Sequence, residues 1–199
     1  MTEWITDAID HMGYMGIAFL MFVENIFPPI PSEVIMPAAG FTAARGDLAF
    51  AGVILAGRIG SLLGALPWYY AGRWLGGERL KRFAAHHGRW LSISGSEMEK
   101  ALSWFDRHGG KAVFVGRVVP TVRTLISVPA GIVHMKFWKF IAWSAAGTML
   151  WTGVLAWGGL ILGDQYGKVK AYLGPVSIAV IALIVLVYIY RVLTFEPDD

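Results

Sequence analysis

The sequence predicts an all-α polytopic membrane protein whose 199 residues form one membrane domain (1–199). The first observation is composition: 56% of the residues are hydrophobic and only 16% are charged, as is typical of proteins embedded in lipid. The second is that two apolar segments are interrupted by prolines and charges. The third is an internal repeat relating the two halves of the chain.

The two interrupted segments are residues 22–40 (FVENIFPPIPSEVIMPAAG) and 113–131 (VFVGRVVPTVRTLISVPAG). Each carries two charges of one sign: Glu24 and Glu33 in the first, Arg117 and Arg123 in the second. Charges at membrane depth are costly unless paired or facing a wet cavity, and broken backbone is tolerated there only under cover of protein or water. We therefore expect two re-entrant hairpins that meet, with the acids and arginines forming the functional site. The residues expected to shape the hairpins are Pro28, Pro31, Pro120, Pro129 and Gly131.

Each expected hairpin is followed by an apolar segment long enough to span a bilayer. The expected order is an N-terminal interfacial helix (2–12), repeat 1 (14–76), an amphipathic cytoplasmic linker (77–111), repeat 2 (112–163) and a C-terminal transmembrane helix (168–194). The three expected spans are Leu48–Leu75, Phe137–Leu162 and Val169–Leu193.

The repeat is visible when Phe50–Gly76 is laid over Phe137–Gly163 without a gap. The alignment pairs Gly60 with Gly147, Ser61 with Thr148, and Gly72 with Gly159, and upstream Pro37-Ala-Ala-Gly40 parallels Pro129-Ala-Gly131. One crossing per unit, joined by a linker that does not cross, requires the copies to be inverted, as in transporters with a site near the midplane. Chance matching in a glycine-rich chain is the alternative.

Orientation follows from the basic residues. Of seventeen Lys and Arg, eleven fall on the side of the linker and C-terminus, three fall on the other side, and Arg58, Arg117 and Arg123 lie within the membrane. The positive-inside rule then places the linker and C-terminus in the cytoplasm and the N-terminus outside.

Candidate roles follow from side-chain chemistry. Paired guanidiniums at Arg117 and Arg123 suit a phosphate-bearing headgroup, while Glu24 and Glu33 suit proton coupling or gating. The alternative is that these four residues form structural ion pairs, although a buried ion pair is a poor stabilising device. Arg58 and Ser32 are possible accessory residues. With no cysteine, and no acidic partner at ligand spacing for His86-His87, we expect neither a metal site nor a cofactor.

The segment Phe114-Val-Gly-Arg117-Val-Val-Pro120-Thr-Val-Arg123-Thr, followed by Ala130-Gly131, resembles the signature of the DedA family, which shares its domain with the SNARE-associated Golgi (VTT) proteins. Glu24-Asn25 before a proline-rich turn and Tyr69-Tyr-Ala-Gly72-Arg73 fit the same pattern. The resemblance implies a multi-pass protein of the bacterial inner (cytoplasmic) membrane. It also implies that the family's essential acids and arginines fall at Glu24, Glu33, Arg117 and Arg123. The spacing between the acids varies within the family, so the resemblance identifies Glu24 more firmly than Glu33.

The resemblance and the charges together predict a lipid translocase, not an enzyme. The expected cargo is a phosphate-headed lipid, undecaprenyl phosphate in particular, moved with possible proton coupling in support of cell envelope homeostasis. Three alternatives stay open: a proton-coupled transporter of a small solute or drug, a phospholipid scramblase, and a membrane lipid-phosphate phosphatase. The sequence predicts no nucleic-acid partner and leaves the oligomeric state undetermined.

Overall fold

The computed structural model describes residues 3–26, 32–91, 95–120 and 122–162. These residues form helices and turns, with no strand among them, which confirms the all-α class for this part of the chain. The helices are α1 (Glu3–Ile26), α2 (Ser32–Ala44), α3 (Phe50–Leu91), α4 (Gly95–Val118), α5 (Ser127–Ile132) and α6 (Phe137–Leu162). The expected C-terminal transmembrane helix (168–194) lies outside the described residues, as do Pro28 and Pro31.

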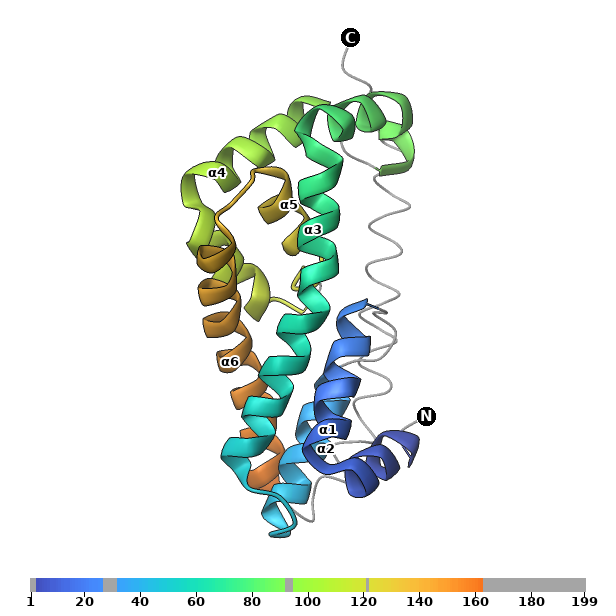
Figure 1. The fold of residues 1–199 in the computed structure, drawn as a ribbon, viewed down its shortest axis with the longest axis vertical. Helices are drawn as coiled ribbons and strands as arrows, with labels where there is room; N and C mark the ends of the chain where they lie inside the picture. Colours follow the sequence, from blue (N-terminus) through green and yellow to red (C-terminus); the bar gives the residue numbers. More distant parts are fainter. Residues whose placement is uncertain (1–2, 27–31, 92–94, 121, 163–199) are drawn as a thin grey trace.

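α1 and α2 form a first helical hairpin in the lower half of the molecule (Figure 1). α1 is broken at Gly13, whose φ of 55° and ψ of −129° are non-helical, so the short segment before it lies across the longer arm. Ile5 and Ile9 of that segment are buried, whereas Trp4 and Met12 are exposed. An amphipathic helix therefore begins the chain, and the arm after it is too short to span a bilayer alone.

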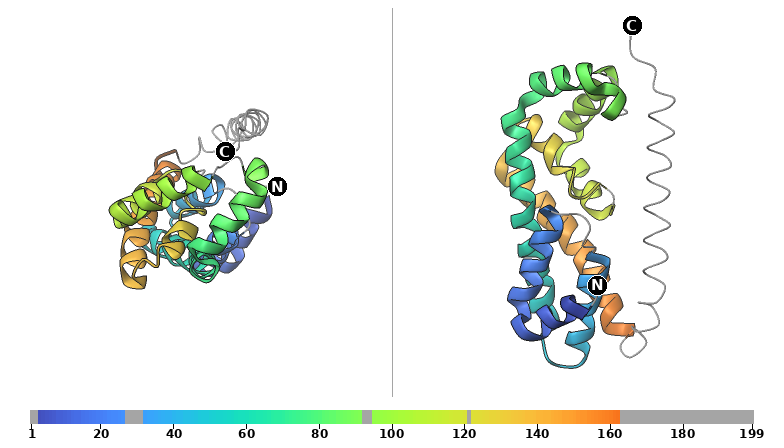
Figure 2. Two further views of the ribbon diagram at one scale, coloured as in Figure 1. Left: turned by 90° about the horizontal axis from the view of Figure 1, so that it is seen from above. Right: turned by 90° about the vertical axis from the view of Figure 1, so that its right-hand side faces the viewer.

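The last part of α4 and α5 form a second hairpin in the upper half of the molecule (Figures 1 and 2). α4 changes direction at Gly109, whose φ is 30°. The turn from Val119 to Ile126 contains Pro120, which is exposed, and Pro129 lies inside α5. Successive backbone hydrogen bonds, from Arg123 N to Val119 O and from Ile126 N to Val122 O, keep this turn compact.

Within the described residues, two helical segments are long and apolar enough to cross a bilayer: Phe50–Gly76 within α3, and α6. Only 39% and 33% of the most apolar stretch of each segment is buried, whereas a core helix of a soluble protein would be mostly buried. On α3, Leu55, Ile59 and Leu63 form an exposed stripe at four-residue spacing. These faces suit contact with lipid.

The linker expected over 77–111 is helical where the structure describes it. Its backbone continues α3 as far as Leu91 and then forms most of α4 up to the break at Gly109. Gly76, with a φ of 66°, marks where α3 turns away from its long axis (Figure 1). This left-handed conformation favours glycine, because a Cβ there would crowd the residue's own backbone.

The hairpins pack on the two long helices in an exchanged pattern. The first arm of each hairpin lies on the long helix that follows it: α1 on α3, and α4 on α6. The second arm lies on the other long helix: α2 on α6, and α5 on α3.

Glycines aligned by the internal repeat make equivalent close contacts. A Cβ on Gly40 would lie 2.0 Å from the carbonyl oxygen of Ala156, and one on Gly131 would lie 2.1 Å from that of Tyr69. Likewise Gly159 faces the Pro37 carbonyl and Gly72 the Val128 carbonyl. Residues that the repeat aligns therefore make the same backbone contacts in both halves. At all four contacts a small residue lets two helices approach closely, as is common in membranes.

Candidate functional site

A buried ion pair joins the two hairpins. Glu24, near the end of α1, accepts a hydrogen bond from Nη2 of Arg123 in the turn between α4 and α5. Both side chains are less than a tenth exposed. The carboxylate also accepts a bond from Asn25 Nδ2 at 3.2 Å. The expectation that an acid of one hairpin meets an arginine of the other is confirmed for this pair.

Arg117, on α4, lies in the same region without a carboxylate partner among the described residues. Its Nη1 donates to Asn25 Oδ1 at 3.3 Å and its Nη2 to Ser127 Oγ at 2.8 Å, while its Nε has no hydrogen-bond partner. Its guanidinium carbon lies 5.9 Å from the centre of the Phe140 ring, within cation–π range. The residue is 3% exposed, so the groups that hold its positive charge within the described part of the chain are all neutral.

The two arginines line a cavity of about 10 Å³ between the hairpins, enough for about one water molecule. It is lined by residues of both repeats whose side chains carry polar groups: Asn25, Ser61, Arg117, Arg123, Thr148 and Trp151. With two guanidiniums and one carboxylate in contact there, the described groups leave an excess of one positive charge.

Glu33 is not part of this cluster. It follows Ser32 at the start of α2, is half-buried, and accepts a hydrogen bond from Ser32 Oγ at 3.4 Å. Ser32 in turn accepts a bond from the Trp151 indole at 3.3 Å. The expectation that all four charged residues meet is therefore wrong for Glu33, which reaches the cavity only through Ser32 and Trp151.

Arg58 does not join the cavity lining either. Its Nη1 lies 3.9 Å from Sδ of Met149 on the neighbouring long helix. Of the expected hairpin-shaping residues, Gly131 has the clearest structural role, because α5 touches the backbone of α3 there.

Four cavity residues had no assigned role in the sequence-based site: Asn25, Ser61, Thr148 and Trp151. Ser61 and Thr148 carried a usable signal, since the repeat aligns them and each follows an aligned glycine. The Asn25 side chain fixes the end of α1 by donating to the Met21 carbonyl at 3.1 Å, while the backbone carbonyl of Asn25 accepts from the Trp68 indole at 2.8 Å. No spacing rule identifies such a residue.

The fold and this site define a class. Long apolar helices with exposed faces, two broken hairpins and a buried, charged cavity between them are features of helical membrane proteins that handle polar or charged groups inside the bilayer.

The comparisons with known proteins identify the family. A VTT domain matches residues 30–161. The chain is 40% identical over 196 residues (98% of this chain, 92% of the relative) to a Lactococcus lactis subsp. cremoris (strain MG1363) protein named alkaline phosphatase-like protein. It is 34% identical over 190 residues (96% and 94%) to undecaprenyl phosphate transporter A of Staphylococcus aureus (strain NCTC 8325 / PS 47). It is 28% identical over 166 residues (81% and 71%) to inner membrane protein YqjA of Escherichia coli (strain K12).

The chain belongs to the VTT-domain (DedA) family of membrane proteins. The resemblance seen in the sequence is thereby confirmed. No solved structure matches the chain.

Proposed function

We propose that the protein translocates a phosphate-headed lipid, undecaprenyl phosphate in particular, across the bacterial cytoplasmic membrane from the outer to the inner leaflet. The observation that carries this proposal is the buried excess of positive charge at Arg117 and Arg123. A buried cation without a counter-charge is costly, and a phosphate that enters when the hairpins move apart supplies that counter-charge with geometry suited to guanidinium. The S. aureus relative's name supplies the most specific lipid.

In this proposal both hairpins are re-entrant and the two repeats are inverted in the membrane. The support is the exchanged packing of the hairpin arms on α3 and α6, together with the equivalent glycine contacts. The two hairpins also enter from opposite ends of the long axis and approach each other near its middle (Figure 2). That arrangement suits a midplane site reached alternately from either leaflet.

Glu24 is the proposed gate. When a phosphate binds the arginines, it competes with Glu24 for Arg123, and a carboxylate freed inside the bilayer must find another partner or take up a proton. Glu33, the more exposed of the two acids, is proposed to exchange protons between water and the site, which it approaches through Ser32. Lipid binding would then be coupled to proton uptake, so affinity falls as pH rises.

The phosphatase alternative is prompted by the L. lactis relative's name. Such an enzyme needs a nucleophile held by a general base. Ser127 is the hydroxyl bonded to Arg117, and in the described part of the chain neither a carboxylate nor an imidazole is hydrogen-bonded to it. The Ser32 hydroxyl does donate to a carboxylate, that of Glu33, but Ser32 does not line the arginine cavity. We therefore favour transport over catalysis. A scramblase or a small-solute transporter would not require two arginines facing one cavity.

The test uses full-length protein in lipid vesicles containing undecaprenyl phosphate. It measures lipid binding, movement of the headgroup between leaflets, and release of inorganic phosphate. Arg117→Gln should weaken binding about tenfold or more, since hydrogen bonds to charged groups are worth about 1.5–3 kcal/mol. Arg58→Gln is the matched control, because it removes an arginine from the apolar part of α3 but outside the cavity.

Three outcomes are decisive. Loss of binding and transport in Arg117→Gln but not in Arg58→Gln supports the proposal. Equal binding by the folded parent and Arg117→Gln contradicts headgroup recognition. Release of phosphate by the parent that disappears in Ser127→Ala establishes the phosphatase instead.

A further inference from the structure

A second hollow, far larger than the central cavity, lies where the apolar part of α3 ends. It has a volume of about 600 Å³, within the usual range for small-molecule sites. Its lining comes from the end of the α3 span and the turn between α5 and α6: Tyr70, Ala71, Arg73, Trp74 and His134. Among the described residues that line it, Arg73 is positively charged and none is acidic.

Arg73 is held in place by buried partners. Its Nη1 donates to Tyr69 Oη at 3.1 Å, and the Tyr69 hydroxyl donates to the Met135 carbonyl at 2.6 Å. Tyr69 is only 1% exposed. One corner of the guanidinium is therefore anchored while the residue as a whole stays exposed, and a positioned arginine loses less entropy on binding an anion than a free one.

His134 faces the same groove from a strained position. Its φ of 52° lies in the left-handed region, unusual for a residue with a Cβ, and such strain is found at functional sites. Its Nδ1 lies 3.0 Å from the Ile132 carbonyl oxygen, which requires the proton on Nδ1 if the two are bonded. In the neutral ring Nε2 is then an acceptor, which can receive the hydrogen bond of a singly protonated phosphate monoester, whereas the imidazolium form would donate to a phosphate oxygen.

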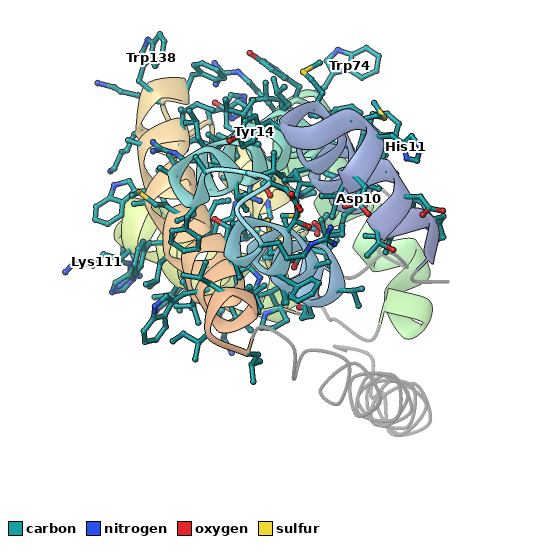
Figure 3. The ribbon with its side chains drawn as sticks, turned by 90° about the horizontal axis from the view of Figure 1, so that it is seen from below. Asp10, His11, Tyr14, Trp74, Lys111 and Trp138 are labelled. Atoms are coloured by element: carbon teal, nitrogen blue, oxygen red, sulfur yellow. The ribbon has the colours of Figure 1, made fainter. Side chains whose placement is uncertain are left out.

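The rest of the lining suits the boundary between membrane and water. Tyr70 and Trp74 are 53% and 86% exposed, and Trp74 projects from the edge of the molecule (Figure 3). Exposed Tyr and Trp are typical of the headgroup level, and the apolar segment of α3 ends two residues later at Gly76. A groove there offers cationic contacts for a headgroup beside aromatic contacts for the first part of an acyl or prenyl chain.

Packed side chains link this groove to the central cavity. Tyr69, which anchors Arg73, stacks on Phe140 with ring centres 4.5 Å apart. Phe140 lies under the guanidinium of Arg117. The anchoring residue of the groove and a lining residue of the cavity are therefore both in contact with one aromatic ring.

We propose that the Arg73–His134 groove binds the phosphate-monoester headgroup of a lipid at the membrane surface, as a station before or after the central arginines. This assignment rests on the proposed function, because it places the groove on the path of the same lipid. Free phosphate carries the same terminal phosphate group as the lipid, so the groove also has to be tested against free phosphate.

The experiment uses full-length protein in nanodiscs and a photoreactive phosphatidic acid, with photoreactive phosphatidylcholine as the neutral probe. Crosslinked peptides are located by mass spectrometry. The variants are Arg73→Gln and His134→Asn for the groove and Arg117→Gln for the cavity. The matched control is Lys139→Gln, an exposed cation on α6 that does not line the groove. Each variant is first shown to be monodisperse with an unchanged melting temperature.

We expect phosphatidic acid, but not phosphatidylcholine, to label the peptide containing Tyr70–Trp74. Labelling there should need about tenfold more lipid in Arg73→Gln, with a smaller loss in His134→Asn. It should be unchanged in Lys139→Gln and retained in Arg117→Gln.

Other outcomes overturn this assignment. Labelling that depends on Arg117 and not on Arg73 rejects the groove and leaves the proposed function standing. Labelling that depends on neither arginine rejects both. If inorganic phosphate displaces the probe at the same concentration as unlabelled phosphatidic acid does, the groove is reassigned to free phosphate.

Discussion

The contact between α2 and α6 gives the sharpest test of the fold. A Cβ added at Gly159 would lie 2.0 Å from the Pro37 carbonyl oxygen and 2.7 Å from that residue's Cα and carbonyl carbon. Ordinary contacts begin at 3.4 Å, so the two backbones would have to separate by about 1.4 Å. Such overpacking costs about 1–3 kcal/mol, and Gly159→Ala should lower the free energy of unfolding by about that amount.

The adjacent glycine is the control. A Cβ at Gly158 meets nothing within 4 Å, so Gly158→Ala should be neutral or stabilising by about 0.5–1 kcal/mol, because alanine loses less backbone entropy in a helix. Gly72→Ala, whose Cβ would lie 2.2 Å from the Val128 carbonyl oxygen, should behave like Gly159→Ala. Thermal unfolding of purified protein in one detergent measures all three. Equal effects of Gly158→Ala and Gly159→Ala would refute the packing described between α2 and α6.

The remaining predictions concern the site and its orientation. Arg123→Lys keeps the charge but loses the planar fork, so lipid binding should weaken in folded protein; full affinity with Lys would mean that the arginine only balances charge. Glu24→Gln removes a competitor for Arg123, so lipid binding measured from about pH 5.5 to about pH 8.5 should become tighter and less pH-dependent while turnover falls. Weaker binding at every pH with an unchanged profile would instead assign Glu24 to holding the hairpins together. For the topology, a single cysteine at Ala44 should react with reagent from outside the cell and one at Ser103 only from the cytoplasm; reaction of both from the same side would exclude inverted repeats.

The long apolar helices were the most predictable part of the fold. The segment expected over Phe137–Leu162 has the bounds of α6, because uninterrupted hydrophobicity decides both the length and the ends of a membrane helix. The repeat alignment pairs Gly72 with Gly159, and in the structure these two glycines make equivalent contacts. Small residues at fixed spacing carry three-dimensional information, because only they permit backbones to touch.

The breaks and the pairing within the site were less predictable. Gly13 and Gly109 change the direction of helices, but the sequence does not distinguish such glycines from those that remain helical. Glu33 was expected beside the arginines and instead bonds to Ser32. Which acid meets which arginine depends on the rotation of short helices about their axes, and the weak amphipathicity of a segment that is apolar on all sides does not specify that rotation.

The exchanged packing of the hairpins has a consequence for biosynthesis. Glu24 and Arg123 are 99 residues apart in sequence, and α2 packs against α6, the last helix of the second repeat. At synthesis rates of about 5–20 residues per second, the acid waits roughly 5–20 s for its partner. During that interval the first hairpin has neither its ion pair nor the helix that covers its second arm. Nascent chains are therefore most vulnerable to misinsertion and proteolysis before the ribosome has completed the second repeat.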